Sequence, residues 1–421
     1  MPLVESGTGE TQAIRKIVSQ NPALRVYRDE GRDVLLAALA ELDLVDRIGQ
    51  VALSDLQLSR QDKSLSRLTI YAIRNCAPSE MGKVMTALRG VTSGEMRRRL
   101  EYLFGFLQTL ETDTVPTGSS DIERTALRTH NPTWWVQYCY RVFGRTRALR
   151  ILSPPSRPRY ARVNTLRNRG RRGLLSIGKS LSDKWGKVKG LEDVFVISGS
   201  LSQFAGQFEN GLFQVQDLAS FLAVSASGPA PGEKVLDLCA APGAKTAALA
   251  QFMKNRGTII SVDYSYRRMT DWRRETHRLG VKIGSPLVAD ASELGVRGLF
   301  DLVLLDPPCS GTGIFDNNPR MKWRLSRKLV EKCSQLQGRM LAKAADLTRP
   351  GGRILYCTCS ITTEENESVV SEFLRNNSEF ELIPCLNSFG SEGIGLREAR
   401  RFYPHQDQTA GYFVAKIQRS Q

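Results

Sequence analysis

The chain has 421 residues, of which 41% are hydrophobic and 24% are charged, and its formal net charge is +16. This length allows two or three domains, and the composition is typical of a folded protein rather than a disordered one. No stretch approaches the roughly 20 consecutive apolar residues of a membrane-spanning helix, so we expect no membrane partner.

The first ten residues contain neither a basic segment nor an apolar one, so we expect no secretory signal. Eight cysteines are spread along the chain without a Cys-x-x-Cys pair, and there are only three histidines. This pattern argues against a disulfide framework and against a structural metal, and it favours a reducing compartment. We therefore expect a cytoplasmic protein that binds no metal.

Residues 1–120 have the pattern of a helical domain. Apolar residues recur at spacings of three and four in the runs 34–42, 65–73 and 96–107. Thr92, with a glutamate three residues later, fits a helix-capping box before the third run. The segment carries 15 basic and 15 acidic residues, so its net charge is zero.

The segment Asp113–Asp121 is rich in turn-forming residues, which predicts a linker and a first boundary at residue 120. The whole positive excess lies after it, and it is densest from Arg141 to Arg172, with eleven arginines and no acidic residue. The guanidinium group matches phosphate and can stack on bases, so nucleic acid is the favoured partner over a merely solvated face. We predict a small α+β subdomain over residues 121–228 that contributes to this binding.

Strand-like and helix-like segments alternate from residue 229 to residue 421. The predicted strands are 234–238, 258–262, 286–288, 302–305, 353–356 and 412–416. The predicted helices are 244–253, 267–278, 326–348 and 366–375. This alternation predicts an α/β domain with a doubly wound, mostly parallel sheet.

The loop Cys239–Lys245 joins the first of these strands to a helix. Its small residues let a ligand approach the backbone, and Gly243 permits an unusual φ next to the positive end of the helix. The loop contains only one glycine, so it is a weak match to the glycine-rich loops that bind nucleotides in other proteins. Asp263 and Asp290 follow the ends of later strands, where carboxylates can bind ribose or adenine, although turn or cap roles are the alternative for each alone.

Two further loops carry thiols, Asp306-Pro-Pro-Cys309-Ser-Gly-Thr-Gly313 and Cys357-Thr-Cys359-Ser360. Each follows an apolar β-type run, so both should lie at the carboxyl edge of the sheet, where open α/β sheets do chemistry. A thiolate facing a carboxylate and a second thiol can attack an electron-poor ring. Burial as a small apolar group is the alternative for any cysteine, and the role of Cys357 stays open.

Together these motifs resemble the NSUN/Sun (RsmB-like) family of S-adenosylmethionine-dependent RNA cytosine-5 methyltransferases. The resemblance covers about residues 122–416 and includes Asn131–Val136, Ala161–Leu166, Gly211–Ser220 and Gly313–Arg324 in the expected order. It implies a Rossmann-like fold, S-adenosylmethionine as the cofactor and RNA as the partner. The helical segment vaguely resembles the NusB-like domains of some members, and a scaffold without RNA contacts is the open alternative.

The resemblance also implies roles for individual residues. Cys359 is expected to be the attacking thiolate, Asp306 to contact the cytosine edge and the cofactor, and Cys309 to assist release of the methylated product. The residues expected to bind the cofactor are Cys239, Ala240, Ala241, Pro242, Gly243, Ala244, Lys245, Asp263, Asp290 and Asp306. The residues expected to contact RNA are Arg162, Asn164, Lys322, Trp323 and Arg324, with packing as an equal alternative for Trp323.

Three other functions share part of this pattern. Enzymes that methylate exocyclic amines place an aromatic residue after the acid-Pro-Pro motif, where this chain has Cys309. DNA cytosine-5 enzymes carry their nucleophile in a Pro-Cys loop, which makes Cys309 a rival to Cys359, but the Thr-Cys-Ser motif favours the RNA family. A catalytically inactive RNA-binding assembly factor of the same fold is the remaining alternative. Ribosomal RNA is slightly favoured over transfer RNA as the substrate.

Overall fold

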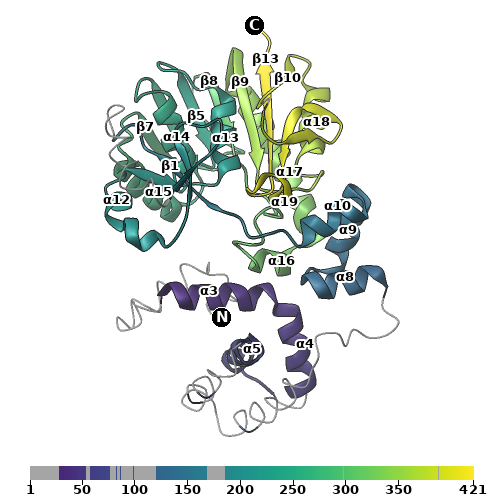
Figure 1. Ribbon diagram of the computed structural model, residues 1–421. Coiled ribbons are helices and arrows are strands. Elements are labelled where there is room, and N and C mark those ends of the chain that lie inside the picture. The colour runs from purple at the N-terminus through teal and green to yellow at the C-terminus, as the bar shows by residue number, and fades with distance from the viewer. Residues whose placement is uncertain are drawn as a thin grey trace. The chain divides into compact units, whose positions relative to one another are not determined.

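A computed structural model of the chain describes residues 28–53, 57–75, 120–167, 185–296, 298–386 and 388–421, and also residues 82, 86 and 98. The chain forms two compact units (Figure 1). The first comprises residues 1–153 and 315–324, and the second comprises residues 154–314 and 325–421. This division differs from the three predicted segments, whose boundaries at residues 120 and 228 stay a prediction.

The described part of the first unit is helical. Its helices are α3 (Arg28–Ala40), α4 (Leu42–Leu53), α5 (Arg60–Asn75), α8 (Asp121–Thr129), α9 (Thr133–Phe143), α10 (Arg145–Leu152) and α16 (Arg320–Arg324). Leu35 and Leu39 of α3 are buried, and Leu68 and Tyr71 of α5 pack against them. The predicted run 65–73 lies within α5, whereas the run 34–42 is divided between α3 and α4.

Helix α8 begins with a capping box that closes the predicted linker. The Ser120 side chain accepts a hydrogen bond from the Glu123 N–H, and the Glu123 carboxylate accepts one from the Ser120 N–H. Asp121 is therefore the first residue of a helix rather than the last residue of a linker. The predicted cap at Thr92 and the predicted helix 96–107, apart from Arg98, lie outside the described residues.

The second unit contains a four-stranded antiparallel sheet with the order β2-β3-β1-β4. Its elements are β1 (Arg159–Val163), β2 (Trp185–Lys187), β3 (Val194–Ile197), the 3-10 helix η3 (Leu201–Phe204), α12 (Ala205–Glu209) and β4 (Phe213–Val215). The Trp185 ring is buried, with its centroid 5.2 Å from the Phe204 ring and 5.0 Å from the Phe213 ring. Edge-to-face aromatic contacts of this kind hold the small core together.

The same unit contains a nine-stranded sheet. Its strands are β5 (Lys234–Leu238), β6 (Thr258–Asp263), β7 (Gly284–Val288), β8 (Phe300–Leu305), β9 (Thr348–Thr358), β10 (Phe380–Ile383), β11 (Ser391–Gly393), β12 (Leu396–Phe402) and β13 (Tyr412–Arg419), and the short helix α19 (Pro404–Asp407) precedes β13. The order is β11-β12-β13-β9-β8-β5-β6-β7, with β10 beside β13. Strands β5 to β9 pair in parallel and the others pair antiparallel. The predicted Rossmann-like α/β fold is confirmed.

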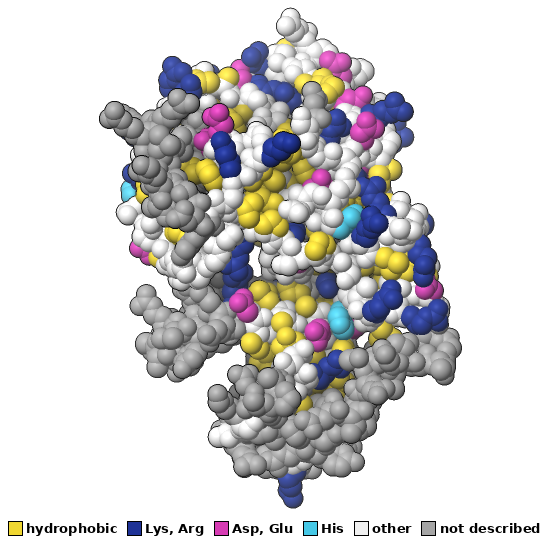
Figure 2. Space-filling model, viewed as in Figure 1, with side chains coloured by type: hydrophobic (Ala, Val, Ile, Leu, Met, Phe, Trp, Pro, Cys, Tyr) yellow, Lys and Arg dark blue, Asp and Glu magenta, His cyan; other side chains and the backbone are white. Residues whose placement is uncertain are grey.

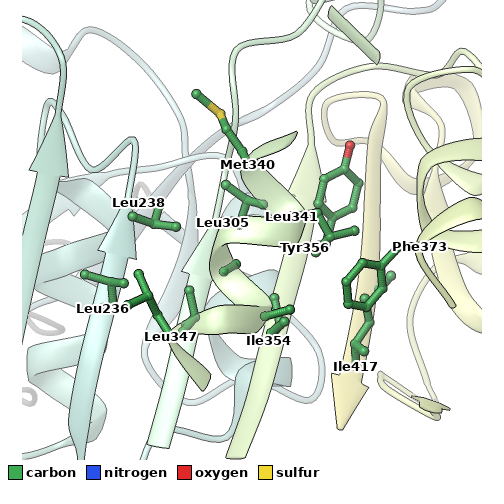
Figure 3. Close-up of a cluster of buried hydrophobic side chains, with 14 of the residues drawn as sticks. Leu236, Leu238, Leu305, Met340, Leu341, Leu347, Ile354, Tyr356, Phe373 and Ile417 are labelled. Atoms are coloured by element: carbon green, nitrogen blue, oxygen red, sulfur yellow. The ribbon is translucent and has the colours of Figure 1, made fainter. Parts of the chain in front are cut away.

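Helices cover both faces of the nine-stranded sheet (Figure 1). One face carries α13 (Leu218–Ser227), α14 (Ala244–Phe252) and α15 (Tyr266–Leu279), and the other carries α17 (Arg327–Asp346) and α18 (Glu367–Asn376). Figure 3 shows the core on the second face, where Leu341 and Phe373 lie against Leu305, Tyr356 and Ile417 of the strands. Alternate strand residues fill the two cores, which fixes the direction of each side chain.

The order in which successive strands are added to the sheet reverses between β5 and β8. The chain continues from β5 through α14 to β6 on one side, whereas β8 lies on the other side of β5. In open α/β sheets, ligands bind in the crevice outside the carboxyl ends of the strands at such a point. The loops that follow β5, β6, β8 and β9 all leave the sheet at this edge.

Within the described ranges, no helix is both long enough and apolar enough to cross a membrane.

Asp237 of β5 is a buried carboxyl group in the middle of this sheet. It is 1% exposed, its Oδ2 accepts a hydrogen bond from Thr246 Oγ1 at 2.5 Å, and its Oδ1 has no partner among the described residues. Burial raises the pKa of Asp237 to about 7. Between about pH 4 and pH 7 the folded state therefore holds a proton that the unfolded state has lost, so stability falls as the pH rises through this window.

We expect Asp237→Asn to remove this pH dependence, because an amide does not ionise. The wild type should lose roughly 2 to 3 kcal/mol from this group between pH 5 and pH 8, and the variant should not. Urea unfolding of both proteins at the two pH values measures the difference. An equal loss of stability in wild type and variant would show that Asp237 ionises normally in the folded state.

Candidate active site

The loop after β5 has a backbone shape that depends on small residues. Cys239 has a φ of 63° and Gly243 has a φ of 109°. A Cβ atom on Gly243 would lie 3.2 Å from side-chain atoms of Trp272 and Thr276, both on α15. The loop also follows the sheet closely, since the Ala240 N–H donates to the Val262 carbonyl of β6 at 2.8 Å. Glycine is therefore required where α14 begins.

Asp263, the last residue of β6, fixes this loop from the neighbouring strand. Its side chain is buried, and its Oδ2 lies 3.0 Å from Arg268 Nη1 and 3.4 Å from the Ala241 backbone N. The Arg268 guanidinium also donates to the Ala241 carbonyl at 2.6 Å. A carboxylate has about four lone pairs, so Asp263 can accept further hydrogen bonds besides those from Arg268 and Ala241.

Asp290 is exposed after β7, where it accepts hydrogen bonds from the Ser292 hydroxyl at 2.7 Å and the Ser292 N–H at 2.8 Å. These hydrogen bonds hold the pKa of Asp290 below its ordinary value. Asp290 and Asp263 line one cavity of about 320 Å³ at the carboxyl edge. The other lining residues are Cys239, Tyr264, Ala291, Pro308, Leu336 and Met340.

Several of these wall residues were not predicted from the sequence. Tyr264 directly follows Asp263 and is 66% exposed. An aromatic residue next to a carboxylate that is expected to bind ribose is a sequence signal that indicates this wall residue. Leu336 and Met340 come from α17, nearly 80 residues along the chain from Asp263. Only the folding of α17 over the sheet brings them to the cavity, so no local sequence pattern indicates them.

Asp306 follows β8 and forms an ion pair with Lys245 of α14. Lys245 Nζ lies 2.6 Å from Asp306 Oδ2, and the Tyr412 hydroxyl lies 3.4 Å from Asp306 Oδ1. Burial disfavours the ammonium group, but the charge and hydrogen bond of Asp306 together with other nearby acidic groups outweigh it and raise the pKa of Lys245 above its ordinary value. Lys245 therefore stays protonated, and its contact with Asp306 holds the start of α14 to the loop after β8.

Cys357 is fully buried beside this ion pair, 3.8 Å from Asp306 Oδ1 and 3.4 Å from the Tyr412 hydroxyl. Burial and the Asp306 charge raise the pKa of the Cys357 thiol above its ordinary value. A protonated, inaccessible thiol is a poor nucleophile. The structure thus favours a packing role for Cys357, which the sequence left open.

The two thiols predicted to take part in chemistry are in contact. Cys309 Sγ and Cys359 Sγ lie 3.1 Å apart, and both residues are partly buried. The hydrogen bond between them, together with burial, raises the pKa of Cys309 well above its ordinary value. The Cys309 thiol therefore keeps its proton at neutral pH, and its sulfur lies within hydrogen-bonding distance of Cys359 Sγ.

Two glycines hold the loops after β8 and β9 against each other. The Gly313 N–H donates to the Cys359 carbonyl at 2.9 Å, and the Gly411 N–H donates to the Gly313 carbonyl at 2.8 Å. A Cβ atom on Gly313 would lie 1.9 Å from the Gly411 carbonyl oxygen. No side chain fits there, so the backbone around Cys359 is fixed by direct contact of three loops.

Arg162 and Asn164, predicted to contact RNA, lie inside the second unit and are each 1% exposed. Arg162 donates to the side chains of Gln216 and Gln251, and Asn164 donates to the Gly211 and Leu279 carbonyls. These side chains hold β1 against α14 and α15. Their RNA contact, which the family resemblance implied, stays a prediction, and no sequence signal indicated their burial.

The three other residues predicted to contact RNA lie on α16 in the first unit. Lys322 Nζ donates to the His130 carbonyl at 3.3 Å, and Trp323 Nε1 donates to the Leu39 carbonyl at 2.8 Å. Both side chains therefore have packing partners, whereas Arg324 is exposed.

On the face shown in Figure 2, Lys and Arg side chains cover more surface than Asp and Glu side chains do.

A doubly wound sheet with a cavity beside its switch point, and thiols on the loops after β8 and β9, defines a Rossmann-like α/β protein with a ligand site at the carboxyl edge of its sheet. A family model described as 16S rRNA methyltransferase RsmB/F matches residues 224–418. The chain is 30% identical over 334 residues to the probable ribosomal RNA small subunit methyltransferase B of Bacillus subtilis. The match covers 76% of this chain and 73% of that protein. The chain belongs to the NSUN/RsmB family of RNA cytosine-C5 methyltransferases.

Other relatives share the same region. The chain is 38% identical over 285 residues to the 28S rRNA (cytosine(4447)-C(5))-methyltransferase of Homo sapiens, covering 62% of this chain and 34% of that protein. It is 34% identical over 221 residues to the tRNA (cytosine(72)-C(5))-methyltransferase of Pyrococcus horikoshii, covering 52% and 55%. The chain thus spans between about a third and about half of the length of these two relatives.

A solved structure is similar to nearly the whole chain. The crystal structure of PH0851 superposes with a TM-score of 0.82 at 28% sequence identity, and the match covers 96% of this chain and 93% of that one.

Proposed function

We propose that this protein transfers a methyl group from S-adenosylmethionine to carbon 5 of a cytidine in structured RNA. The observation that carries the proposal is the contact between the Cys309 and Cys359 thiols, 3.1 Å apart, on the loops that follow β8 and β9. Methylation at carbon 5 needs one group to attack carbon 6 and another to take the hydrogen from carbon 5. The cytosine-C5 activities named for the relatives support the proposal.

The residues around the cavity fit S-adenosylmethionine. About 320 Å³ is in the range of small-molecule sites, and the wall combines an aromatic ring with two carboxylates. We propose that Asp263 accepts hydrogen bonds from the ribose and Asp290 accepts one from the adenine amino group. The loop that begins at Cys239 would lie along the amino-acid end, since Cys239 is part of the cavity wall. When bound, the cofactor supplies an electrophilic methyl group on a positively charged sulfur.

In the first step we propose that Cys359 attacks carbon 6 of the cytosine as a thiolate. The new S–C6 bond moves electron density toward carbon 5, which makes that carbon a nucleophile. With the cofactor bound, carbon 5 would take its methyl group, and the cofactor sulfur would be left as a neutral thioether. Asp306, held by Lys245, would accept a hydrogen bond from the cytosine amino group and orient the ring.

In the second step we propose that Cys309, directly or through a water molecule, takes the hydrogen from carbon 5. The S–C6 bond then breaks and Cys359 leaves as a thiolate. Cys309 must first lose its own proton, and its raised pKa opposes this in the free protein. Once the Cys359 sulfur is bonded to carbon 6 it carries no charge, so the main cause of the raised pKa is removed and Cys309 ionises more easily.

The RNA substrate is proposed to be ribosomal RNA in preference to transfer RNA, on the names of the family model and of two of the relatives. We also propose that the protein acts in the cytoplasm. Free thiols at the proposed centre need a reducing compartment, and seven cysteines among the described residues are free.

The test is to incubate the purified protein with methyl-labelled S-adenosylmethionine and with unmodified ribosomal or transfer RNA, and to identify the labelled nucleoside after digestion. We expect 5-methylcytidine, with label entering the ribosomal RNA pool. Label in transfer RNA alone would correct the substrate and leave the reaction unchanged. A different methylated base would overturn the mechanism, and cofactor binding without any transfer to either RNA would favour an inactive assembly factor.

A further inference from the structure

A buried carboxylate lies directly behind the thiol pair. Glu365, between β9 and α18, is 0% exposed. It accepts five hydrogen bonds, all from neutral groups, and no Lys, Arg or His among the described residues forms an ion pair with it. Burying a carboxylate without a cation is costly, so a carboxylate at this place calls for a role beyond packing.

The donors to Glu365 come from the residues that follow the two thiols. The Ser310 N–H donates to Oε1 at 2.7 Å and the Ser310 hydroxyl donates to Oε2, while the Ser360 hydroxyl donates to Oε2 at 2.8 Å. Ser310 is next to Cys309 in the chain, and Ser360 is next to Cys359. One carboxylate thus holds both thiol-bearing loops, each at the residue adjacent to its sulfur.

The carboxylate is itself anchored to rigid elements. Gln337 of α17 donates from Nε2 to Glu365 Oε1 at 3.1 Å and to the Pro308 carbonyl at 2.9 Å. The Tyr356 hydroxyl of β9 donates to the Glu365 carbonyl at 2.6 Å. A helix and a strand therefore fix Glu365, and Glu365 in turn fixes the loops.

We propose that Glu365 is a positioning residue that keeps the Cys309 and Cys359 thiols in contact by binding the loops that carry them. The catalytic consequence rests on the function proposed above, whereas the contact itself does not. A carboxylate only accepts hydrogen bonds, so it orients every surrounding donor inward, and an amide of the same size cannot, because its NH2 group would face Ser310 or Ser360. Its charge also contributes to the raised pKa of Cys309, after the hydrogen bond to Cys359 and burial.

Phenylarsine oxide tests the contact without any methyl transfer. It reacts with two neighbouring thiols to give a cyclic dithioarsenite and one water molecule, so its rate reports how well the sulfurs are placed. We expect wild type to take up one arsenical that resists a monothiol wash, and Cys309→Ala to take up none. Glu365→Gln should react about tenfold more slowly and lower kcat by about 10- to 100-fold, with the KM for RNA little changed.

Glu364→Gln is the matched control, since it removes the neighbouring, partly buried carboxylate, and it should behave as wild type in both assays. Thermal unfolding of each variant separates positioning from stability. If Glu365→Gln does not fold, Ser310→Ala and Ser360→Ala, which each remove one donor, decide the question by the same two readouts. Wild-type arsenical uptake and kcat in the folded variants would overturn the proposal.

The two proposals can fail separately. If wild type binds the arsenical across the pair and Glu365→Gln binds it about tenfold more slowly, but no RNA is methylated, the positioning role stands and the methyltransferase proposal fails. If RNA is methylated and Glu365→Gln matches wild type in both readouts, the methyltransferase proposal stands and the positioning role fails.

Discussion

Cys359→Ala is expected to lower the rate of methyl transfer to RNA by at least about a thousand-fold. Without the thiolate, carbon 6 is not attacked and carbon 5 of cytosine stays a poor nucleophile. The substitution removes only the sulfur, because the loop is held through the Cys359 carbonyl, which accepts from the Gly313 N–H. The measurement is a single-turnover reaction with labelled S-adenosylmethionine and excess enzyme.

Two controls make the result specific to this thiol. Cys333→Ala removes a partly buried cysteine from α17 and should keep wild-type activity. Binding of the cofactor to Cys359→Ala should be unchanged, since Cys359 is not part of the cavity wall. If Cys359→Ala transferred methyl groups and Cys309→Ala did not, the nucleophile would be Cys309, as in the Pro-Cys loop of DNA cytosine-5 enzymes.

The central strands could be predicted because burial on both faces leaves a simple signature. Segments such as 302–305 are short apolar runs between polar residues, and all six predicted strands are present. Strand β12, Leu396–Phe402, carries three arginines and a glutamate, so its pattern does not indicate a strand. It is tolerated because buried Arg401 pairs with buried Glu367 of α18, a contact that only the folded chain creates.

The sequence predicted which loops form the candidate site, but not which of their side chains are in contact. The position of Cys309 and Cys359 after strands indicated a shared edge, but their contact depends on the close approach of Gly313 and Gly411, which no spacing indicates. Glu365 lies in the polar run Thr362–Glu367, which has the composition of a solvated turn. Its burial needs donors from three separate segments. Tertiary hydrogen bonding therefore hid the residue that we propose positions both thiols.

Cys309→Ala is expected to trap RNA on the protein rather than to prevent the reaction from starting. Attack by Cys359 and methyl transfer do not need a base at position 309, whereas removal of the hydrogen from carbon 5 does. The multiple-turnover rate should fall by about 100-fold or more, the range that a general base contributes. Meanwhile an RNA–protein adduct carrying the methyl label should accumulate, visible as a shifted band on a denaturing gel.

The double variant Cys309→Ala/Cys359→Ala assigns the bond, because it should form no adduct if the adduct is a thioether of Cys359. A Cys309→Ala variant that turns over normally without an adduct would assign the hydrogen abstraction to another group.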